Sequence, residues 1–313
     1  MPKSFQDPAP APLTVLLLWH MHQPFYVIPG QRRALLPWAR LHALKDYVDM
    51  PRLLSEFPTV RATFNLVPSL LWQLQQYAEG RLTDIDLDLS KKPAAELTKE
   101  ERIYLLRNFF SLDWTRILPR LPRLAQLLKK RGRLLHREKL PQLAEEFTVQ
   151  EFLDIQVLFN LGWSGNVLLE SQLLRALLRK ERGFTEEDKT ALLQIQADFL
   201  STVIPTYRLL AAAGQAEIAA SPLYHPILPL LVSTDFGRLS DSRTPVPERR
   251  FNYPNDAGAQ ISKAIRVMEA EFGFRCAGMW PSEGSVADEI VPFWHAAGIR
   301  WVASDEEVLW NSM

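Results

Sequence analysis

The chain has 313 residues, of which 47% are hydrophobic and 23% are charged, the composition of a soluble globular protein able to bury a sizeable core. Lysine plus arginine and aspartate plus glutamate both number 36, so the net charge of zero gives no electrostatic reason to expect nucleic acid or an anionic membrane as a partner. The single cysteine, Cys276, excludes an internal disulfide and fits a reducing compartment.

The N-terminal segment combines one lysine with acidic and proline residues and lacks the apolar core of a signal peptide. The apolar run from Leu13 to Trp19 has the length of one strand, far short of a membrane span. We therefore expect a cytoplasmic protein. The continuous apolarity of this run predicts a strand that is buried on both faces, as in a parallel sheet covered by helices.

Alternating strand and helix patterns follow. A helix is expected at 45–54, a strand at 60–64 and a helix from Leu70 onward. Residues 85–200 are rich in Leu, Arg, Lys and Glu at helical spacing, which predicts a mostly helical insertion. The alternation then returns, with strands expected at 215–220, 275–280 and 299–303, and with helices at 191–213, at 256–272 capped by Asp256, and at 286–297.

This alternation predicts an α/β fold with a parallel sheet. Polar and aromatic residues follow each expected strand, which favours a β/α barrel with its site at the C-terminal face. We expect 1–84 to supply the first β/α units of a catalytic barrel, 85–200 the insertion, and 201–313 further, truncated units. An open doubly wound sheet is the alternative, but no glycine-rich phosphate loop supports it.

His20 and His22 end the first expected strand, and side chains two residues apart on a strand point to the same side. They are interpreted as ligands of substrate hydroxyls, as metal ligands, or as structural residues. Glu217 lies inside an apolar strand, where burying a carboxylate is costly unless it is paired, so it faces either a cleft or an outer edge. His225 precedes a proline and is interpreted as a site residue or a structural one.

The turn from Trp280 to Glu283 joins an expected strand to a helix, where catalytic groups collect. Trp280 offers a flat apolar face for a sugar ring, and Glu283 an acid, base or nucleophile. The alternative for Glu283 is a helix N-terminal acid favoured by the helix dipole. Asp305 follows the last expected strand and could also face the cleft.

Five segments together resemble glycoside hydrolase family 57 and occur in that family's order. They are 19–24 (WHMHQP), 64–70 (FNLVPSL), 214–218 (GQAEI), 221–229 (SPLYHPILP) and 278–285 (GMWPSEGS). The resemblance implies an incomplete (β/α)7 barrel and retaining chemistry on α-glucans, as in α-amylases, amylopullulanases, 4-α-glucanotransferases and branching enzymes. It also implies that Glu283 is the nucleophile, that His22 and Glu217 line the sugar site, and that Trp280 forms an aromatic wall.

The sequence departs from the family in one respect. The family's general acid/base is an Asp in a later Asp-Gly-Glu-like segment, and none follows Glu283 here. Since a retaining glycosidase needs two carboxyl groups about 5–5.5 Å apart, we expect the acid/base to lie beyond this chain, which would then be the N-terminal portion of a longer one.

The primary hypothesis is therefore an α-glucan glycosidase or transglycosidase that needs no cofactor and no metal. Its catalytic residue is Glu283, and its partner is an α-glucan or oligosaccharide. Two alternatives stay open: a metal-dependent hydrolase and a non-catalytic sugar-binding module. The expected substrate-binding residues are His20, His22, Glu217, His225, Trp280 and Asp305, of which His20, His22, His225 and Asp305 would be the metal ligands in the first alternative.

Overall fold

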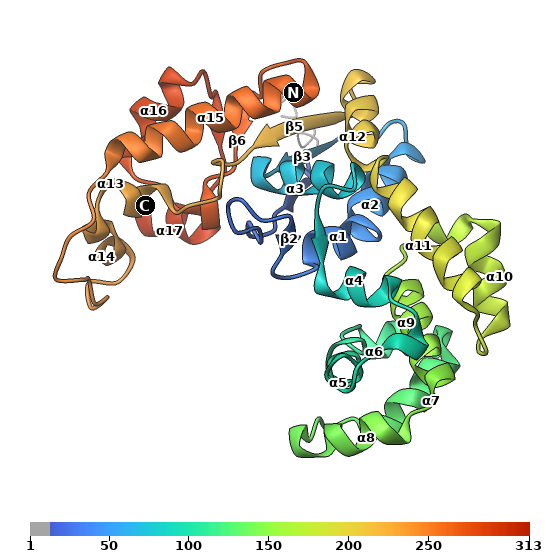
Figure 1. Ribbon diagram of the computed structural model, residues 1–313. Helices are drawn as coiled ribbons and strands as arrows, with labels where there is room; N and C mark the ends of the chain where they lie inside the picture. Colours follow the sequence, from blue (N-terminus) through green and yellow to red (C-terminus); the bar gives the residue numbers. More distant parts are fainter. Residues whose placement is uncertain (1–12) are drawn as a thin grey trace, which may run out of the picture.

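A parallel five-stranded sheet forms the centre of the computed structural model, which describes residues 13–313 (Figure 1). The strands stand in the order β1-β3-β5-β6-β7, so each is hydrogen-bonded to the next one along the chain in this sheet. Their bounds are β1 Leu18–Met21, β3 Ala62–Leu66, β5 Ala216–Ala220, β6 Gly278–Met279 and β7 Trp301–Val302. A second, two-stranded sheet pairs β2 (Arg33–Ala34) with β4 (Thr83–Asp84).

The sheet does not close into a full barrel. Within residues 13–313, β1 and β7 each pair with one neighbour only and form the two edges. The predicted fold class, an α/β protein with an incomplete β/α barrel and a helical insertion, is confirmed.

Helices connect the strands and cover one face of the sheet. Those of the β/α units are α1 (Trp38–Ala43), α2 (Asp46–Ser55), α3 (Pro68–Ala78), α12 (Val203–Ala212), α13 (Leu228–Val232), α14 (Gly237–Ser240), α15 (Pro254–Phe272), α16 (Val291–Ala296) and α17 (Glu306–Ser312). Phe64 on β3 is buried against Tyr207 on α12, with an edge-to-face ring contact at 5.2 Å between centroids. The alternation of side chains along a strand places Thr63, Asn65 and Glu217 on the opposite face, which becomes the concave side of the sheet.

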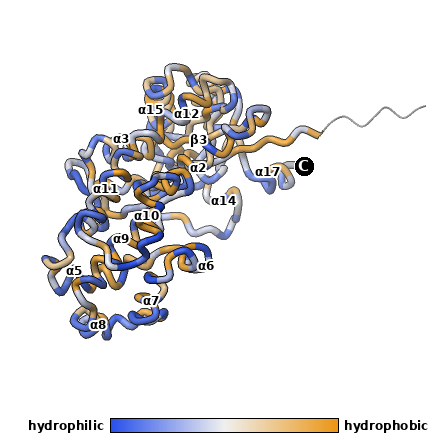
Figure 2. Tube along the Cα trace, turned by 90° about the vertical axis from the view of Figure 1, so that its right-hand side faces the viewer, coloured by the Kyte–Doolittle hydropathy of each residue, from blue (hydrophilic) through white to orange (hydrophobic). Residues whose placement is uncertain are grey.

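Residues 85–200 contain helices and no strand, as predicted. In Figure 1 they form the arm that extends away from the sheet, and Figure 2 shows apolar residues gathered between its helices. These helices are α4 (Ile85–Lys91), α5 (Lys99–Asn108), α6 (Trp114–Ile117), α7 (Pro122–Arg131), α8 (Leu140–Glu146), α9 (Val149–Gly162), α10 (Gln172–Lys180) and α11 (Glu186–Leu200). Helix α9 is buried almost throughout and forms the centre of this arm. The expected boundaries of the three regions stay a prediction.

Short 3-10 helices complete the described structure: η1 (Ala94–Glu96), η2 (Leu118–Arg120), η3 (Arg137–Lys139), η4 (Leu168–Glu170), η5 (Thr234–Phe236), η6 (Ser282–Gly284) and η7 (Asp288–Ile290). At the junction of arm and sheet, Arg40 donates to Asp84 through Nε at 2.7 Å and Nη2 at 3.0 Å. Both side chains are buried, so this ion pair ties α1 to β4 where the arm begins.

Three sequence predictions are corrected. The first strand begins at Leu18 rather than Leu13, and Leu13 and Leu16 are 90% and 88% exposed. Because β1 is an edge strand, the apolar residues before it are not buried by a second neighbouring strand. The helix expected at 191–213 breaks at 201–202, where both hydroxyls donate to carbonyls of the preceding turn. Helix α15 begins at Pro254 after Tyr253, so Asp256 lies inside it and is not its cap.

The predicted absence of a signal-peptide core falls mostly on residues 1–12, which lie outside the described residues. From residue 13 onward, no helix combines the length and apolarity needed to cross a membrane.

Candidate active site

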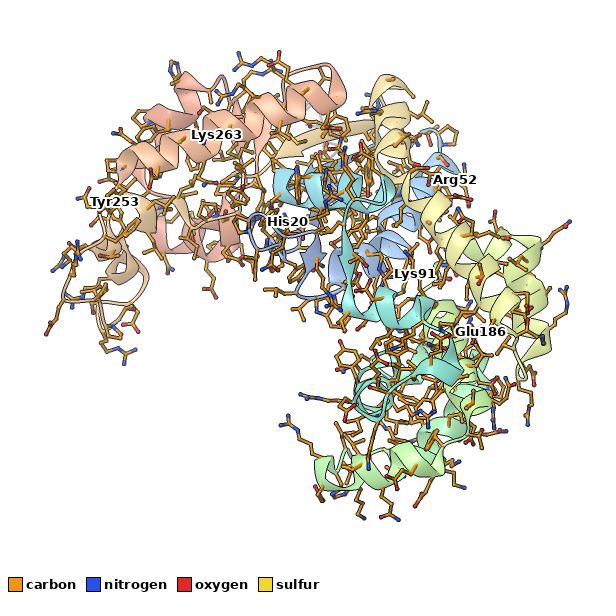
Figure 3. All side chains as sticks on the ribbon, viewed as in Figure 1. His20, Arg52, Lys91, Glu186, Tyr253 and Lys263 are labelled. Carbon is orange, nitrogen blue, oxygen red and sulfur yellow. The ribbon has the colours of Figure 1, made fainter. Side chains whose placement is uncertain are left out.

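Three histidines and a tryptophan converge at the carboxyl ends of the central strands. His20 lies on β1 and His22 just after it, His225 follows β5, and Trp280 follows β6. Figure 3 places His20 near the middle of the molecule, on the inner side of the arch formed by the sheet and the arm. Parallel strands end at the same edge, which is why residues far apart in sequence meet here.

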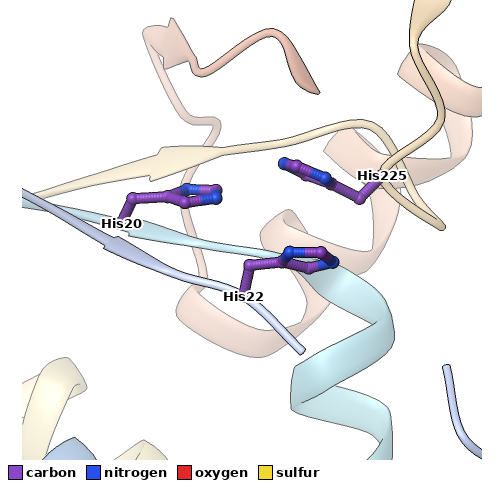
Figure 4. A group of neighbouring side chains, drawn as sticks. All are labelled: His20, His22 and His225. Atoms are coloured by element: carbon purple, nitrogen blue, oxygen red, sulfur yellow. The ribbon is translucent and has the colours of Figure 1, made fainter. Parts of the chain in front are cut away.

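The rings pack against one another in a small cluster (Figure 4). His22 and His225 stack, with centroids 3.9 Å apart and an interplanar angle of 24°. His20 lies 5.1 Å from His225 and 5.8 Å from His22. The Trp280 indole stacks on His20 at 5.3 Å and extends the aromatic surface.

Asn65, fully buried on β3, fixes the orientation of His20. Its Nδ2 donates to the carbonyl of Ala220 at 2.6 Å and to that of Ala219 at 3.3 Å, which identifies Oδ1 as the acceptor. Oδ1 accepts from His20 Nδ1 at 2.5 Å, so the proton of His20 is on Nδ1 and Nε2 carries the free lone pair. Ser221 Oγ lies 3.0 Å from the same Oδ1 and 3.1 Å from the Trp280 carbonyl oxygen.

The surroundings keep all three imidazoles neutral. Burial lowers the pKa of His20, although Asn65 and Glu283 act in the opposite direction. Burial and the neighbouring His20 lower the pKa of His22. Burial, then His22 and His20, lower the pKa of His225 to about 3. At neutral pH the cluster therefore offers nitrogen lone pairs and N–H groups, which suit either sugar hydroxyls or a metal ion.

Glu283 stands at the rim of this cluster. Its side chain is 66% exposed, and Oε1 lies 3.7 Å from His225 Nδ1. Since His225 is neutral, this is a contact between a carboxylate and an uncharged ring rather than an ion pair. The turn that carries Glu283 is fastened to the sheet, because the Trp280 amide donates to the Ala220 carbonyl at 2.8 Å.

Glu217 is exposed on the concave face of β5. It pairs in register with Thr63, two residues before Asn65, which corresponds to about 7 Å along the strand direction. Glu217 Oε1 accepts from Trp301 Nε1 at 2.9 Å, and Oε2 lies 3.4 Å from Thr63 Oγ1. Trp301 reaches it by crossing Gly278, where a Cβ atom would meet the indole at 2.0 Å.

The backbone of Asp305 lies beside Gly284, the residue that follows Glu283. Its amide nitrogen lies 3.4 Å from the point where a Cβ on Gly284 would stand. The carboxylate caps α17, accepting from the Glu307 amide at 2.8 Å. Of the predicted site residues, the structure thus brings together His20, His22, His225, Trp280 and Glu283, whereas Glu217 and Asp305 bind other partners.

Asn65, Ser221 and Trp301 were not predicted as site residues. Asn65 carried a usable signal, because a polar residue between Phe64 and Leu66 in an apolar strand demands a buried partner, the same reasoning that singled out Glu217. The role of Trp301 depends on its register against Gly278, which no local pattern reveals.

A family model described as Glycosyl hydrolase family 57 matches residues 16–312. The chain belongs to this family. The resemblance seen in the sequence is thereby confirmed, and the candidate site described above lies at the C-terminal edge of the parallel sheet. No match to a curated protein was found.

Several solved structures are similar to this chain. The α-amylase AmyC from Thermotoga maritima shares 13% identity over 95% of this chain and 40% of its own, with a TM-score of 0.46. A branching enzyme from Thermococcus kodakaraensis shares 15% identity over 92% of this chain and 38% of its own, with a TM-score of 0.44. The 4-α-glucanotransferase from Thermococcus litoralis shares 13% identity over 92% of this chain and 21% of its own, with a TM-score of 0.39. The chain spans about two fifths of the first two proteins.

Proposed function

We propose that this family 57 chain carries the nucleophile side of a retaining glycoside hydrolase or transglycosidase that acts on α-glucans. The observation that supports this most is the position of Glu283, an accessible carboxylate beside three neutral imidazoles and an indole at the C-terminal edge of the sheet. Cleft carboxylates next to aromatic and hydrogen-bonding side chains are the machinery of glycoside hydrolysis.

In this proposal, Glu283 forms a bond to the anomeric carbon while the bond from that carbon to the glycosidic oxygen breaks. Trp280 provides a flat apolar face for a sugar ring, and the imidazoles of His20, His22 and His225 exchange hydrogen bonds with its hydroxyls. Sugar contacts by Glu217 and Asp305 stay predictions, since Trp301 and the α17 amide occupy their carboxylates here. A cytoplasmic location likewise stays a prediction.

The leaving oxygen needs a proton from a second carboxyl group. Asp305 follows the next strand, but its carboxylate caps α17. We therefore propose that the general acid/base comes from outside the residues described here.

Covalent trapping with a 5-fluoro maltosyl fluoride tests the nucleophile separately from the acid. Fluoride leaves without protonation, so the reagent esterifies a competent nucleophile even where no acid is present. We expect mass spectrometry of peptides to find the sugar on Glu283, to find none in Glu283→Gln, and to find it again in the control Glu289→Gln, whose side chain is exposed nearby.

A label on another carboxylate would contradict the assignment of Glu283. Saccharide binding that survives Glu283→Gln without any labelling of the unaltered chain would instead identify a non-catalytic sugar-binding module.

A further inference from the structure

The three histidines have the geometry of a ligand set. One ring nitrogen from each of His20, His22 and His225 lies within 4.8 Å of the other two. Tetrahedral coordination with bonds of about 2.0–2.1 Å places ligand nitrogens about 3.4 Å apart, so the rings need to approach by up to about 1.4 Å. His22 is partly exposed and can make this movement, while the Asn65 hydrogen bond holds His20 and the turn that follows β5 holds His225.

One ring nitrogen of His20 and one of His225 already lie beside a side-chain oxygen. His20 Nδ1 is bound to Asn65 Oδ1 at 2.5 Å, and His225 Nδ1 faces Glu283 Oε1 at 3.7 Å. Histidines that bind metals characteristically place their other nitrogen against a carbonyl or a carboxylate, which fixes the ring and raises its basicity. Asn65 and Glu283 stand in those outer positions.

A buried nitrogen in the cluster has no partner. His225 is 9% exposed, and its Nε2 makes no hydrogen bond although it is shielded from the surface. An unsatisfied buried polar atom costs free energy, and a bound ligand would remove that cost.

From these observations we propose that His20, His22 and His225 form a binding site for a divalent transition metal ion, Zn²⁺ in particular, with one coordination position left open. An all-imidazole set excludes Mg²⁺ and Ca²⁺, which take oxygen ligands, and suits Zn²⁺ and Co²⁺. The proposed function assigns the same three imidazoles to sugar hydroxyls, so a bound ion would compete with those hydrogen bonds. The metal site itself rests on the ring geometry.

Equilibrium dialysis of the metal-free chain against Zn²⁺ tests this proposal, with Co²⁺ as a spectroscopic probe of coordination. We expect one Zn²⁺ per chain and the visible absorption bands of tetrahedral Co²⁺. His22→Gln is the main variant because its side chain is partly exposed, and His225→Gln is a second variant monitored for folding by circular dichroism. Loss of a residue that only supports a metal-binding histidine weakens metal binding by about 10–100-fold. Each of these two variants should weaken Zn²⁺ binding by more than that, because each removes a ligand itself.

His295→Gln and His136→Gln remove exposed histidines elsewhere and are the matched controls, which should bind Zn²⁺ like the unaltered chain. Absence of stoichiometric binding, or binding equally strong in His22→Gln and His225→Gln, would overturn the proposal. The fluorosugar experiment, run with a chelator present, reports on Glu283 alone, so failure of one proposal is distinguishable from failure of the other.

Discussion

Glu283 and His225 approach each other to 3.7 Å, and both have a left-handed backbone with φ of 56°. Within residues 13–313, Glu181 is the only other non-glycine residue with positive φ. Such conformations cost about 1–3 kcal/mol each and persist where the surroundings enforce them, commonly at functional sites. Two strained residues in contact at a strand-end site therefore indicate that the position of the carboxylate is maintained against local preference.

This strain can be measured by comparing Glu283→Gly with Glu283→Ala. Both variants remove the carboxylate, but glycine adopts φ of 56° without penalty whereas alanine does not. We expect Glu283→Gly to exceed Glu283→Ala in free energy of unfolding by about 1 kcal/mol, measured by urea denaturation. Both should fail to take the fluorosugar label. Equal stability of the two variants would show that the turn relaxes and stores no strain.

The packing of Trp301 across Gly278 predicts a second outcome. Gly278→Ala places a Cβ atom 2.0 Å from the indole Cε2 and Cζ2 atoms, so Trp301 has to move and its hydrogen bond to Glu217 breaks. We expect a loss of about 1–3 kcal/mol in the free energy of unfolding.

The control for Gly278→Ala is the same substitution in a Trp301→Ala background, where no indole remains to clash. Its cost there should fall to a few tenths of a kcal/mol, giving a coupling energy of about 1 kcal/mol or more in the double-mutant cycle. Additive costs would contradict the proposed contact.

Strand ends and the residues that follow them were largely predictable from sequence. His20, Trp280 and Glu283 meet because parallel strands end at one edge, so a correct strand order was enough to group them. Asn65 could have been singled out as a polar residue in an apolar strand, but its partners, like that of Trp301, depend on the register between strands, which only the folded sheet fixes. The prediction of a buried strand before Leu18 was wrong for a related reason, since an apolar pattern cannot show that its strand lies at an edge of the sheet.

Asn65 should act as a positioning residue for His20. Replacement by Ala removes the acceptor for His20 Nδ1 and leaves the carbonyl of Ala220 without its 2.6 Å donor. We expect a loss of about 1–3 kcal/mol in the free energy of unfolding, together with a change of His20 from the Nδ1–H tautomer to a mixture. Long-range ¹H–¹⁵N spectra of the imidazoles report the tautomer. Unchanged His20 signals would show that Asn65 has only a structural role.

The buried carboxyl group of Asp86 on α4 makes the stability of the protein depend on pH. Its side chain is buried and accepts from Tyr104 Oη at 2.8 Å, while Asp84 stands nearby, already paired with Arg40. Burial raises the pKa of Asp86 to about 6, with the Tyr104 hydrogen bond and Arg40 lowering it and Asp84 raising it. The folded protein therefore holds this proton more tightly than the unfolded chain does.

Because the folded-state pKa lies above the unfolded one, ionisation of Asp86 costs stability as pH rises from about 4 to 6, and the full cost persists above pH 6. Asp86→Asn keeps the acceptor for Tyr104 and cannot ionise. We expect this variant to be more stable than the unaltered chain by on the order of 2 kcal/mol at pH 7.5 and to lose that advantage near pH 4. Urea denaturation at a series of pH values measures the difference, with the exposed Asp288→Asn as control. If the gain in free energy of unfolding of Asp86→Asn did not vary with pH, the gain would come from packing. Only a titrating carboxylate makes this gain disappear in acid.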